Sequence, residues 1–325
     1  MKSHLGKNYS EVTEFILLGF RTPPKIQILL FLVFLLLYVA TVVGNISMIT
    51  VTKMDSRLQM PMYFFLRNLS YLDLCYSTVI APKTLANVLS NEKKISYSGC
   101  AAQFFFFALF VTTEGFLLPV MAFDRFSAVC SPLLYPVHMS QKVSVQLVTG
   151  SYICGCINSM IQTSCTFSLH FCGENRLDHF FCDIPALIKI SCADTFVNEI
   201  IMFILSALII ITSTNVILAS YASILSTVLK IPSTHGGSKT FSTCDSHIAV
   251  VSLFCGTVFF MYAQPGAISS PEQSKIIAVL YTLVIPMLNP LIYSLRNRDV
   301  KDAVKRGCCP FACRIQQVRG SHRKL

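Results

Sequence analysis

The fold is decided by residues 100–130, which read CAAQFFFFALFVTTEGFLLPVMAFDRFSAVC. Most of this stretch is apolar until the pair Asp124-Arg125 near its end. A helix rises about 1.5 Å per residue, so the segment from Cys100 to Arg125 covers roughly 37 Å, enough to cross a hydrocarbon core of about 30 Å. The sequence therefore predicts a membrane-spanning helix with Cys100 at one membrane face and Arg125 at the other.

The rest of the chain has the same apolar character. Its 325 residues are 53% hydrophobic and 13% charged, with a mean hydropathy of +0.60. Such values are typical of a membrane protein with several spans and unlike those of a soluble globular protein. We therefore expect an all-α bundle of seven transmembrane helices. Their predicted ranges are 26–52, 60–86, 98–130, 142–163, 197–228, 240–263 and 274–295.

The basic residues set the orientation. The chain carries a formal net charge of +10, and its Lys and Arg side chains concentrate in the segments that share the membrane face of Arg125. By the positive-inside rule this face is cytoplasmic, as expected of a multi-pass protein of the plasma membrane. We expect residues 1–25 to be extracellular, 26–295 to form the seven-helix domain and 296–325 to be a cytoplasmic tail. The positive charge then indicates topology and contact with anionic membrane lipids, not nucleic acid.

Both faces carry candidate modification sites. Asn8-Tyr9-Ser10 is a glycosylation sequon on the outer side. Four outer cysteines in an oxidising compartment allow three disulfide pairings. These are Cys100, Cys172, Cys182 and Cys192. On the inner side, the basic stretch 296–306 has one apolar face, which predicts a short amphipathic eighth helix. The cysteines after it, Cys308, Cys309 and Cys313, are candidates for palmitoylation.

Four polar residues fall inside the predicted spans. By residue count, Asp73, Glu114, Asn45 and Asn289 all lie in the middle or inner half of the bilayer. Ionisable groups at this depth are costly, so they face the bundle interior and pair with something. Two hypotheses remain open: a small cation, sodium in particular, shared by Asp73 and Glu114, or a protonated carboxyl group hydrogen-bonded to an asparagine or to water. No other cofactor is expected.

Several motifs point to one family. They are Gly44-Asn45, Pro61-Met62-Tyr63-Phe64-Phe65-Leu66, Met121-Ala122-Phe123-Asp124-Arg125, Lys239-Thr240-Phe241-Ser242-Thr243-Cys244-Asp245-Ser246-His247 and Pro286-Met287-Leu288-Asn289-Pro290-Leu291-Ile292-Tyr293. Over nearly its whole length the chain resembles the olfactory (odorant) receptors, a family of rhodopsin-like G-protein-coupled receptors.

The resemblance implies roles for single residues. Arg125, held at rest by Asp124, would contact a G protein when the sixth helix moves outward. The other implied coupling and switch residues are Tyr221, Lys239, His247, Asn289, Pro290 and Tyr293. Disulfides Cys100–Cys182 and Cys172–Cys192 would brace an outer loop. The implied partner is the stimulatory G protein of olfactory neurons, which raises cyclic AMP, and the implied location is the cilia of these neurons.

The resemblance also implies a ligand pocket between the outer halves of helices three, five, six and seven. The matching residues are chiefly apolar, with a few hydroxyl groups and no charge. They are Phe107, Ala108, Val111, Thr112, Ser206, Ile209, Cys255, Val258, Phe259, Tyr262, Val279 and Thr282. Such a lining suits a small, mostly apolar volatile ligand, an odorant, held by shape with one or two hydrogen bonds.

Other functions are less well supported. A non-olfactory rhodopsin-like receptor for a peptide or an amine would need an acidic residue near Phe107, and the sequence has none there. A seven-helix ion or proton transporter would also bury carboxylates, but no series of titratable groups runs from one membrane face to the other. We expect no enzymatic activity, because no nucleophile, base and orienting group are found together.

Overall fold

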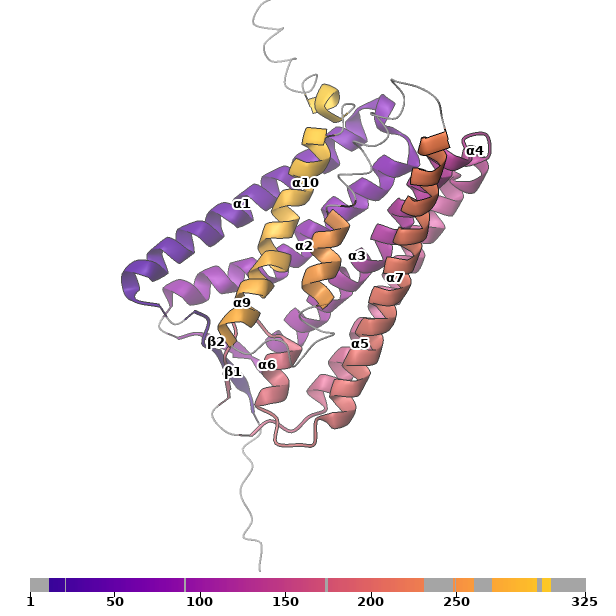
Figure 1. The fold of residues 1–325 in the computed structure, drawn as a ribbon. Coiled ribbons are helices and arrows are strands. Elements are labelled where there is room, and N and C mark those ends of the chain that lie inside the picture. Colours follow the sequence, from indigo (N-terminus) through magenta and orange to yellow (C-terminus); the bar gives the residue numbers. More distant parts are fainter. Residues whose placement is uncertain are drawn as a thin grey trace, which may run out of the picture.

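The computed structural model describes residues 12–20, 22–90, 92–172, 175–230, 248, 250–259, 271–296 and 300–304. Long helices run side by side, as Figure 1 shows, with the short strands gathered at one end of the bundle. The long helices are α1 (Pro24–Met54), α2 (Pro61–Leu89), α3 (Tyr97–Cys130), α5 (Gln141–Phe167) and α7 (Phe196–Lys230). Residues 250–258 are helical and lie in the predicted sixth span. The predicted helical bundle is confirmed, and the ends of the five long helices fall close to the predicted ones, whereas both predicted ends of the sixth span lie outside the described residues.

The seventh span changes its winding partway. It consists of α9 (Pro271–Val279), the π-helix η3 (Leu280–Val284) and α10 (Ile285–Arg296). Pro286 follows the π-helical turn and cannot donate a backbone hydrogen bond. π-helical turns of this kind occur mostly as local insertions within α-helices, often at functional sites. The change of winding therefore begins before the first of the two prolines, Pro286 and Pro290.

The helix ends follow from local sequence. Proline is the first residue of α1 and of α2, where the missing N–H costs nothing. Ser96 caps α3 by accepting a hydrogen bond from the backbone N–H of Gly99 at 3.1 Å. Ser140 caps α5 in the same way through the N–H of Val143 at 3.4 Å. These residues place the turns between the helices at the two ends of the bundle.

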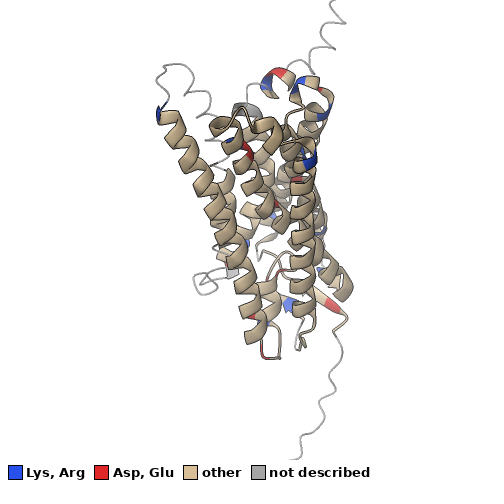
Figure 2. Cartoon of the chain, turned by 90° about the vertical axis from the view of Figure 1, so that its right-hand side faces the viewer, with Lys and Arg blue, Asp and Glu red and all other residues tan. Residues whose placement is uncertain are grey.

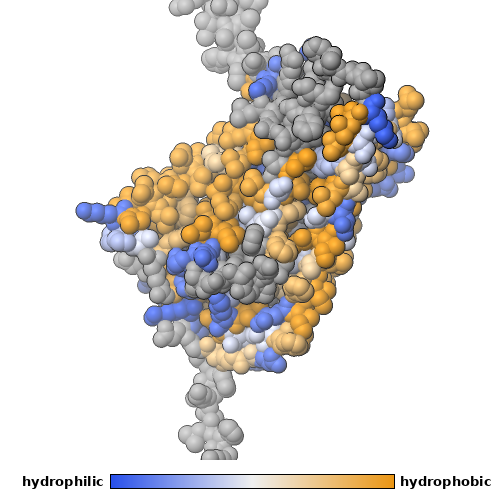
Figure 3. Space-filling view, in the orientation of Figure 1, coloured by the Kyte–Doolittle hydropathy of each residue, from blue (hydrophilic) through white to orange (hydrophobic). Residues whose placement is uncertain are grey.

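The outer surface of the bundle is apolar. Among the described residues, α1, α3, α7 and the segment Glu272–Tyr293 are long and apolar enough to cross a membrane. Leu36 on α1 is 69% exposed and Leu218 on α7 is 62% exposed. Hydrophobic residues cover α1 and much of α7 in Figure 3, whereas Figure 2 shows the charged residues mostly toward the ends of the bundle. A surface of this kind is stable in lipid and not in water.

Close helix contacts depend on two glycines. A Cβ atom on Gly44 would lie 2.9 Å from Cγ of Pro290, so the first-helix and seventh-helix motifs pack directly together. A Cβ atom on Gly155 would lie 2.8 Å from the backbone oxygen of Leu109 and would overlap the hydroxyl of Thr113. A larger residue at Gly44 would push α1 away from α10, and one at Gly155 would push α5 away from α3.

A small sheet at the end of the bundle was not predicted. Strand β1 (Glu14–Leu17) lies between β2 (Lys94–Ser96), to which it is antiparallel, and β3 (Arg176–Leu177), to which it is parallel. Phe15 is fully buried and Leu17 is 1% exposed. The sheet ties the part of the chain before α1 to the loops that precede α3 and α6 (Ile184–Lys189).

Candidate functional site

An internal cavity of about 70 Å³ lies between α3, α5, α7 and the helix of residues 250–258. Its lining is Phe104, Phe107, Ala108, Val111, Thr112, Gly115, Asn158, Gln162, Ser206, Ile209, Ile210, Ser213, Phe254, Cys255 and Val258. One water molecule needs roughly 10–15 Å³ of such space, so the cavity has the room of about five waters. A ligand of a few non-hydrogen atoms fits without rearrangement, and a larger one requires side chains to move.

Most of the predicted pocket residues meet at this cavity. Eight of them line it: Phe107, Ala108, Val111, Thr112, Ser206, Ile209, Cys255 and Val258. Phe259 is 41% exposed, and Tyr262 lies outside the described residues. Val279 packs with the hydrophobic core at the outer end, and the Thr282 hydroxyl donates within its own helix to the carbonyl of Ala278 at 2.7 Å. Val279 and Thr282 are therefore not among the residues that line this cavity.

The fourth span supplies residues that the sequence analysis missed. On α5, the Asn158 amide donates to the hydroxyl of Thr112 at 2.8 Å, and the Gln162 amide donates to the Asn158 side-chain oxygen at 3.2 Å. Both residues line the cavity. Their spacing of four residues was a usable signal, because it puts two amides on one face of the helix. Gln162, Asn158 and Thr112 form a row of polar groups along one side of a chiefly apolar cavity.

A second group of polar side chains lies deeper in the bundle. The Asn289 amide donates to both carboxylate oxygens of Asp73, at 3.1 and 3.0 Å, and the Tyr76 hydroxyl donates to the same carboxylate at 3.1 Å. The Asn45 amide donates to the carbonyl of Pro286 at 3.0 Å. Glu114 is fully buried and within electrostatic reach of Asp73. The structure thus brings Asp73, Glu114 and Asn289 together, and Asn45 is bonded to the seventh helix three residues before Asn289.

Several oxygens in this polar group have no hydrogen-bond partner. They are both carboxylate oxygens of Glu114 and the side-chain oxygens of Asn45 and Asn289. An unsatisfied buried acceptor costs about 1–3 kcal/mol, and a charged one costs more. Hard oxygen donors without hydrogen atoms suit a small hard cation, so this donor set fits a sodium ion.

The inner end of α3 holds the predicted switch pair. The Nε atom of Arg125 lies 3.9 Å from Oδ2 of Asp124, whose side chain is 1% exposed. The other oxygen of Asp124 accepts a hydrogen bond of 2.9 Å from the hydroxyl of Tyr135. Burial, followed by the neighbouring Asp124 carboxylate, raises the pKa of Tyr135, so this hydroxyl keeps its proton and remains a donor. Asp124 is therefore held more closely by Tyr135 than by Arg125, a role for Tyr135 that the sequence analysis did not assign.

The remaining predicted switch residues are only partly described. Tyr293 is 8% exposed, its hydroxyl has no hydrogen-bond partner, and it lies within electrostatic range of Tyr221 and Arg125. Asn289 belongs to the polar group, and Pro290 packs on Gly44. The sixth-helix residues Lys239 and His247 lie outside the described residues, as do Asn8, Cys308, Cys309 and Cys313.

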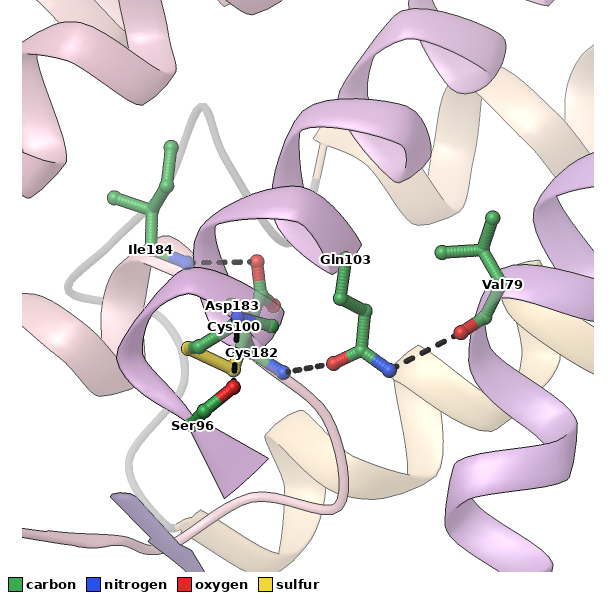
Figure 4. The surroundings of a disulfide bond; sticks show 8 residues. Val79, Ser96, Cys100, Gln103, Cys182, Asp183 and Ile184 are labelled. Atoms are coloured by element: carbon green, nitrogen blue, oxygen red, sulfur yellow. Dashed lines mark hydrogen bonds between the residues drawn. A yellow bond between two sulfur atoms is a disulfide. The ribbon is translucent and has the colours of Figure 1, made fainter. Parts of the chain in front are cut away.

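Two disulfides fix the loop that covers the outer end. Cys100 pairs with Cys182 and Cys172 pairs with Cys192, which confirms the pairing implied by the resemblance. Figure 4 shows the first bond beside Gln103, which accepts from the N–H of Cys182 at 3.0 Å and donates to the carbonyl of Val79 at 3.1 Å. Phe181, which directly precedes Cys182, is fully buried against Phe107, a lining residue of the cavity. The disulfide-bonded loop of residues 172–192 therefore covers the outer end of the cavity.

Buried charge lies where this loop meets α9. Lys275 is fully buried and pairs with Asp178 at 2.7 Å and with Glu272 at 3.0 Å. His179 is 2% exposed, stacks on Phe180 and contacts Phe181 edge-on. Burial, together with the positive charge of Lys275, lowers the pKa of His179 to about 3. The imidazole of His179 is therefore neutral at physiological pH.

Known proteins resemble the chain in sequence and in fold. A family model described as olfactory receptor matches residues 34–310. Olfactory receptor 9S13 of Mus musculus is 58% identical over 90% of this chain and 88% of its own length. Olfactory receptor OR9H1 of Homo sapiens is 54% identical over 92% of this chain and 97% of its own length. Squid rhodopsin has the same fold at 15% identity, with a TM-score of 0.65 over 88% of this chain and 86% of its own.

These matches decide between the classes that the sequence left open. A match of this length and identity excludes an unrelated transporter or enzyme with a similar pattern of spans. The relatives are non-enzymatic membrane receptors that bind a ligand and signal through a G protein. The chain belongs to the olfactory receptor family and has the seven-helix fold of the rhodopsin-like G-protein-coupled receptors.

Proposed function

We propose that this receptor binds a small, mostly apolar volatile odorant in the cavity between α3, α5, α7 and the sixth helix, and activates a stimulatory G protein to raise cyclic AMP. The observation that carries the proposal is the lining of the cavity. Phenylalanine and aliphatic side chains supply dispersion contacts, while Asn158, Thr112 and Gln162 supply hydrogen-bonding groups along one side. None of the described residues that line the cavity is charged, which favours a neutral ligand.

The same helices connect the cavity to the inner face. Thr112 lines the cavity and Arg125 lies further along α3, a separation of roughly 20 Å along the helix axis. α7 similarly carries Ser206 at the cavity and Tyr221 toward the inner end. A ligand that changes the packing of α3 on α7 can therefore alter the surroundings of Arg125 without touching it. Release of Arg125 from Asp124 would then open the inner face to the G protein.

We place the inner face in the cytoplasm and the receptor in the plasma membrane, in cilia of olfactory sensory neurons. The positive-inside rule supports this orientation. Residues 1–25 are then extracellular and residues 296–325 are cytoplasmic. In this orientation Asn8 can be glycosylated, and Cys308, Cys309 and Cys313 can be palmitoylated beyond the helix that includes residues 300–304.

The test is a cyclic AMP readout in cells that express the full chain at their surface, with a chemically diverse panel of odorants. We expect small neutral odorants to raise cyclic AMP. Arg125→Ala should abolish that response while odorant binding persists. A signal that survives Arg125→Ala would contradict the assigned coupling role, and a response only to charged ligands would contradict the cavity.

We also propose that Asp73, Glu114, Asn45 and Asn289 form a binding site for a sodium ion. The unpartnered oxygens of Glu114, Asn45 and Asn289 support this assignment. Bound sodium would supply the positive charge that lets both carboxylates stay ionised. Asp73→Asn and Glu114→Gln should each remove the effect of sodium on agonist affinity, as measured with sodium against a bulky organic cation. Equal sodium effects in the two variants and the unmodified receptor would favour a protonated carboxyl group instead.

A further inference from the structure

A second and larger cavity opens at the inner end of the bundle, on the side of α2 and α5. Its volume is about 600 Å³. The lining residues are Leu58, Gln59, Met60, Pro61, Phe64, Arg67, Tyr135, Pro136, Met139, Ser140, Gln141, Ser144 and Val145. This size is within the range of roughly 300–1,000 Å³ that is usual for ligand pockets. The odorant site does not use it, because none of these residues lines the first cavity.

Among the described residues that line this cavity, Arg67 is the charged one and none is acidic. Its Nη2 atom donates to the carbonyl of Thr52, at the end of α1, at 2.9 Å. Its Nε–H is buried and has no hydrogen-bond partner in the part of the chain that the structure describes. A guanidinium with a free buried donor can still bind an anion, most strongly an oxygen of a phosphate group.

The polarity of the helices adds to the positive charge of Arg67. Pro61 is the first residue of α2 and Gln141 is the first residue of α5, and both line the cavity. The N-terminal end of a long helix carries a partial positive charge and favours phosphate. The cavity therefore combines one arginine with two helix ends of the same sign.

One side of the cavity continues onto the apolar surface of the bundle. Val145, a lining residue on α5, is 45% exposed. Phe64 and Arg67 line the cavity from α2, and Tyr71, one turn beyond Arg67 on the same face, is 49% exposed. An anion that also carries hydrocarbon chains could place its phosphate beside Arg67 and its chains along Val145 and Tyr71.

We propose that this inner cavity binds the headgroup of an anionic phospholipid from the leaflet at the Arg125 face. Arg67 binds the phosphate, and the acyl chains lie in the groove between α2 and α5. Tyr135 gives the site a link to signalling, because it lines the cavity and also donates its hydroxyl to Asp124, next to Arg125. A lipid in this site contacts a residue that is one hydrogen bond from the coupling pair.

The chain has no tryptophan, so one introduced tryptophan reports on one place. Val145→Trp puts the reporter at the cavity, and Ile153→Trp puts a control on an exposed position further along α5, 53% exposed in the native chain. The purified full-length receptor is placed in phosphatidylcholine nanodiscs. Quenching is then compared between phosphatidylserine and phosphatidylcholine that each carry a doxyl label near the top of an acyl chain.

At Val145→Trp we expect phosphatidylserine to quench with about fivefold preference over phosphatidylcholine, the effect of one basic residue on an anionic lipid. The preference should be close to one at Ile153→Trp. Arg67→Gln in the Val145→Trp background should remove the preference, whereas Arg67→Lys should keep most of it. Lys83→Gln is the matched control, because it removes one positive charge at the other end of α2 and should leave the preference unchanged.

Equal quenching by the two lipids, or a preference that survives Arg67→Gln, would overturn the proposal. If Arg67→Gln fails to fold, salt provides the second measurement, since added salt should lower the preference of the Val145→Trp receptor itself. Soluble glycerol phosphate separates the two sources of phosphate. If glycerol phosphate displaces labelled phosphatidylserine completely, the cavity is a site for a free phosphate compound, and the lipid site is refuted.

Discussion

Gly115 offers a direct test of where the ligand binds. It is a lining residue of the 70 Å³ cavity and has no side chain of its own. In Gly115→Ala, the new Cβ atom would lie 3.5 Å from Cγ2 of Ile209 and 3.8 Å from Cε1 of Phe254, which are ordinary van der Waals distances. The substitution therefore takes space from the cavity without forcing α3 away from α7.

The size of the effect follows from the cavity. One methyl group occupies a noticeable share of a cavity that has room for about five waters. Shape discrimination by one methylene group is worth about 1–3 kcal/mol in an apolar pocket, or roughly 5- to 150-fold in affinity. The helix itself should gain up to about 1 kcal/mol, because alanine is a better helix former than glycine. We expect unchanged surface expression and a weaker response to ligands that fill the cavity.

The assay is cyclic AMP in response to a homologous series of neutral odorants that grows by one methylene group. Gly115→Ala should shift the longest effective member down by about one methylene group and leave short members nearly as potent as before. Gly150→Ala is the control, because a Cβ atom there has no neighbour within 4 Å. Gly155→Ala should lower surface expression instead, since its Cβ atom would meet Leu109 and Thr113. Equal loss of every member of the series in Gly115→Ala would refute the assignment of this cavity.

Three more predictions follow from the structure. Asn158→Leu removes the amide that donates to Thr112, and it should weaken odorants with a hydroxyl or carbonyl group about tenfold relative to their hydrocarbon analogues, with Ser159→Ala as a control in the same assay. Tyr135→Phe leaves Asp124 without its 2.9 Å partner, so Asp124 should hold Arg125 more tightly and basal cyclic AMP should fall about fivefold; unchanged basal signalling would contradict this. His179 has a pKa of about 3 in the folded receptor, below the value of about 6.5 for a free histidine. Stability should therefore be unaffected above about pH 6.5 and fall by up to about 1.4 kcal/mol per pH unit as the pH drops toward 3, and thermal unfolding of His179→Phe should lack this slope.

The sequence predicted those features that depend on distance along one helix. The depth of Glu114, the inner position of Arg125 and the helix ranges all follow from a fixed rise per residue. Asp73, Asn45 and Asn289 were grouped because each is polar at a similar depth, and the structure brings them together.

Features that depend on chain reversals or on short strands were not predictable in this way. Tyr135 reaches Asp124 only because the chain turns between Ser131 and Leu134, after α3 ends. Strand β1 has four residues, and its partners come from segments far away in sequence. Val279 and Thr282 were assigned to the pocket by resemblance, and they lie at the start of η3 and within it, a π-helix that the sequence analysis did not predict. No local pattern encodes any of these contacts.

The central claim, that an odorant binds between α3, α5, α7 and the sixth helix, is tested most directly by binding of a labelled odorant to two variants of α7. Ile209 lines the cavity, whereas Ile211 is 58% exposed on the outer surface of the same helix. Ile209→Phe fills the cavity and should weaken binding at least tenfold, a cost of about 1.4 kcal/mol or more. Ile211→Phe adds the same bulk toward lipid and should leave binding unchanged. Equal affinities in the two variants would show that the odorant binds elsewhere.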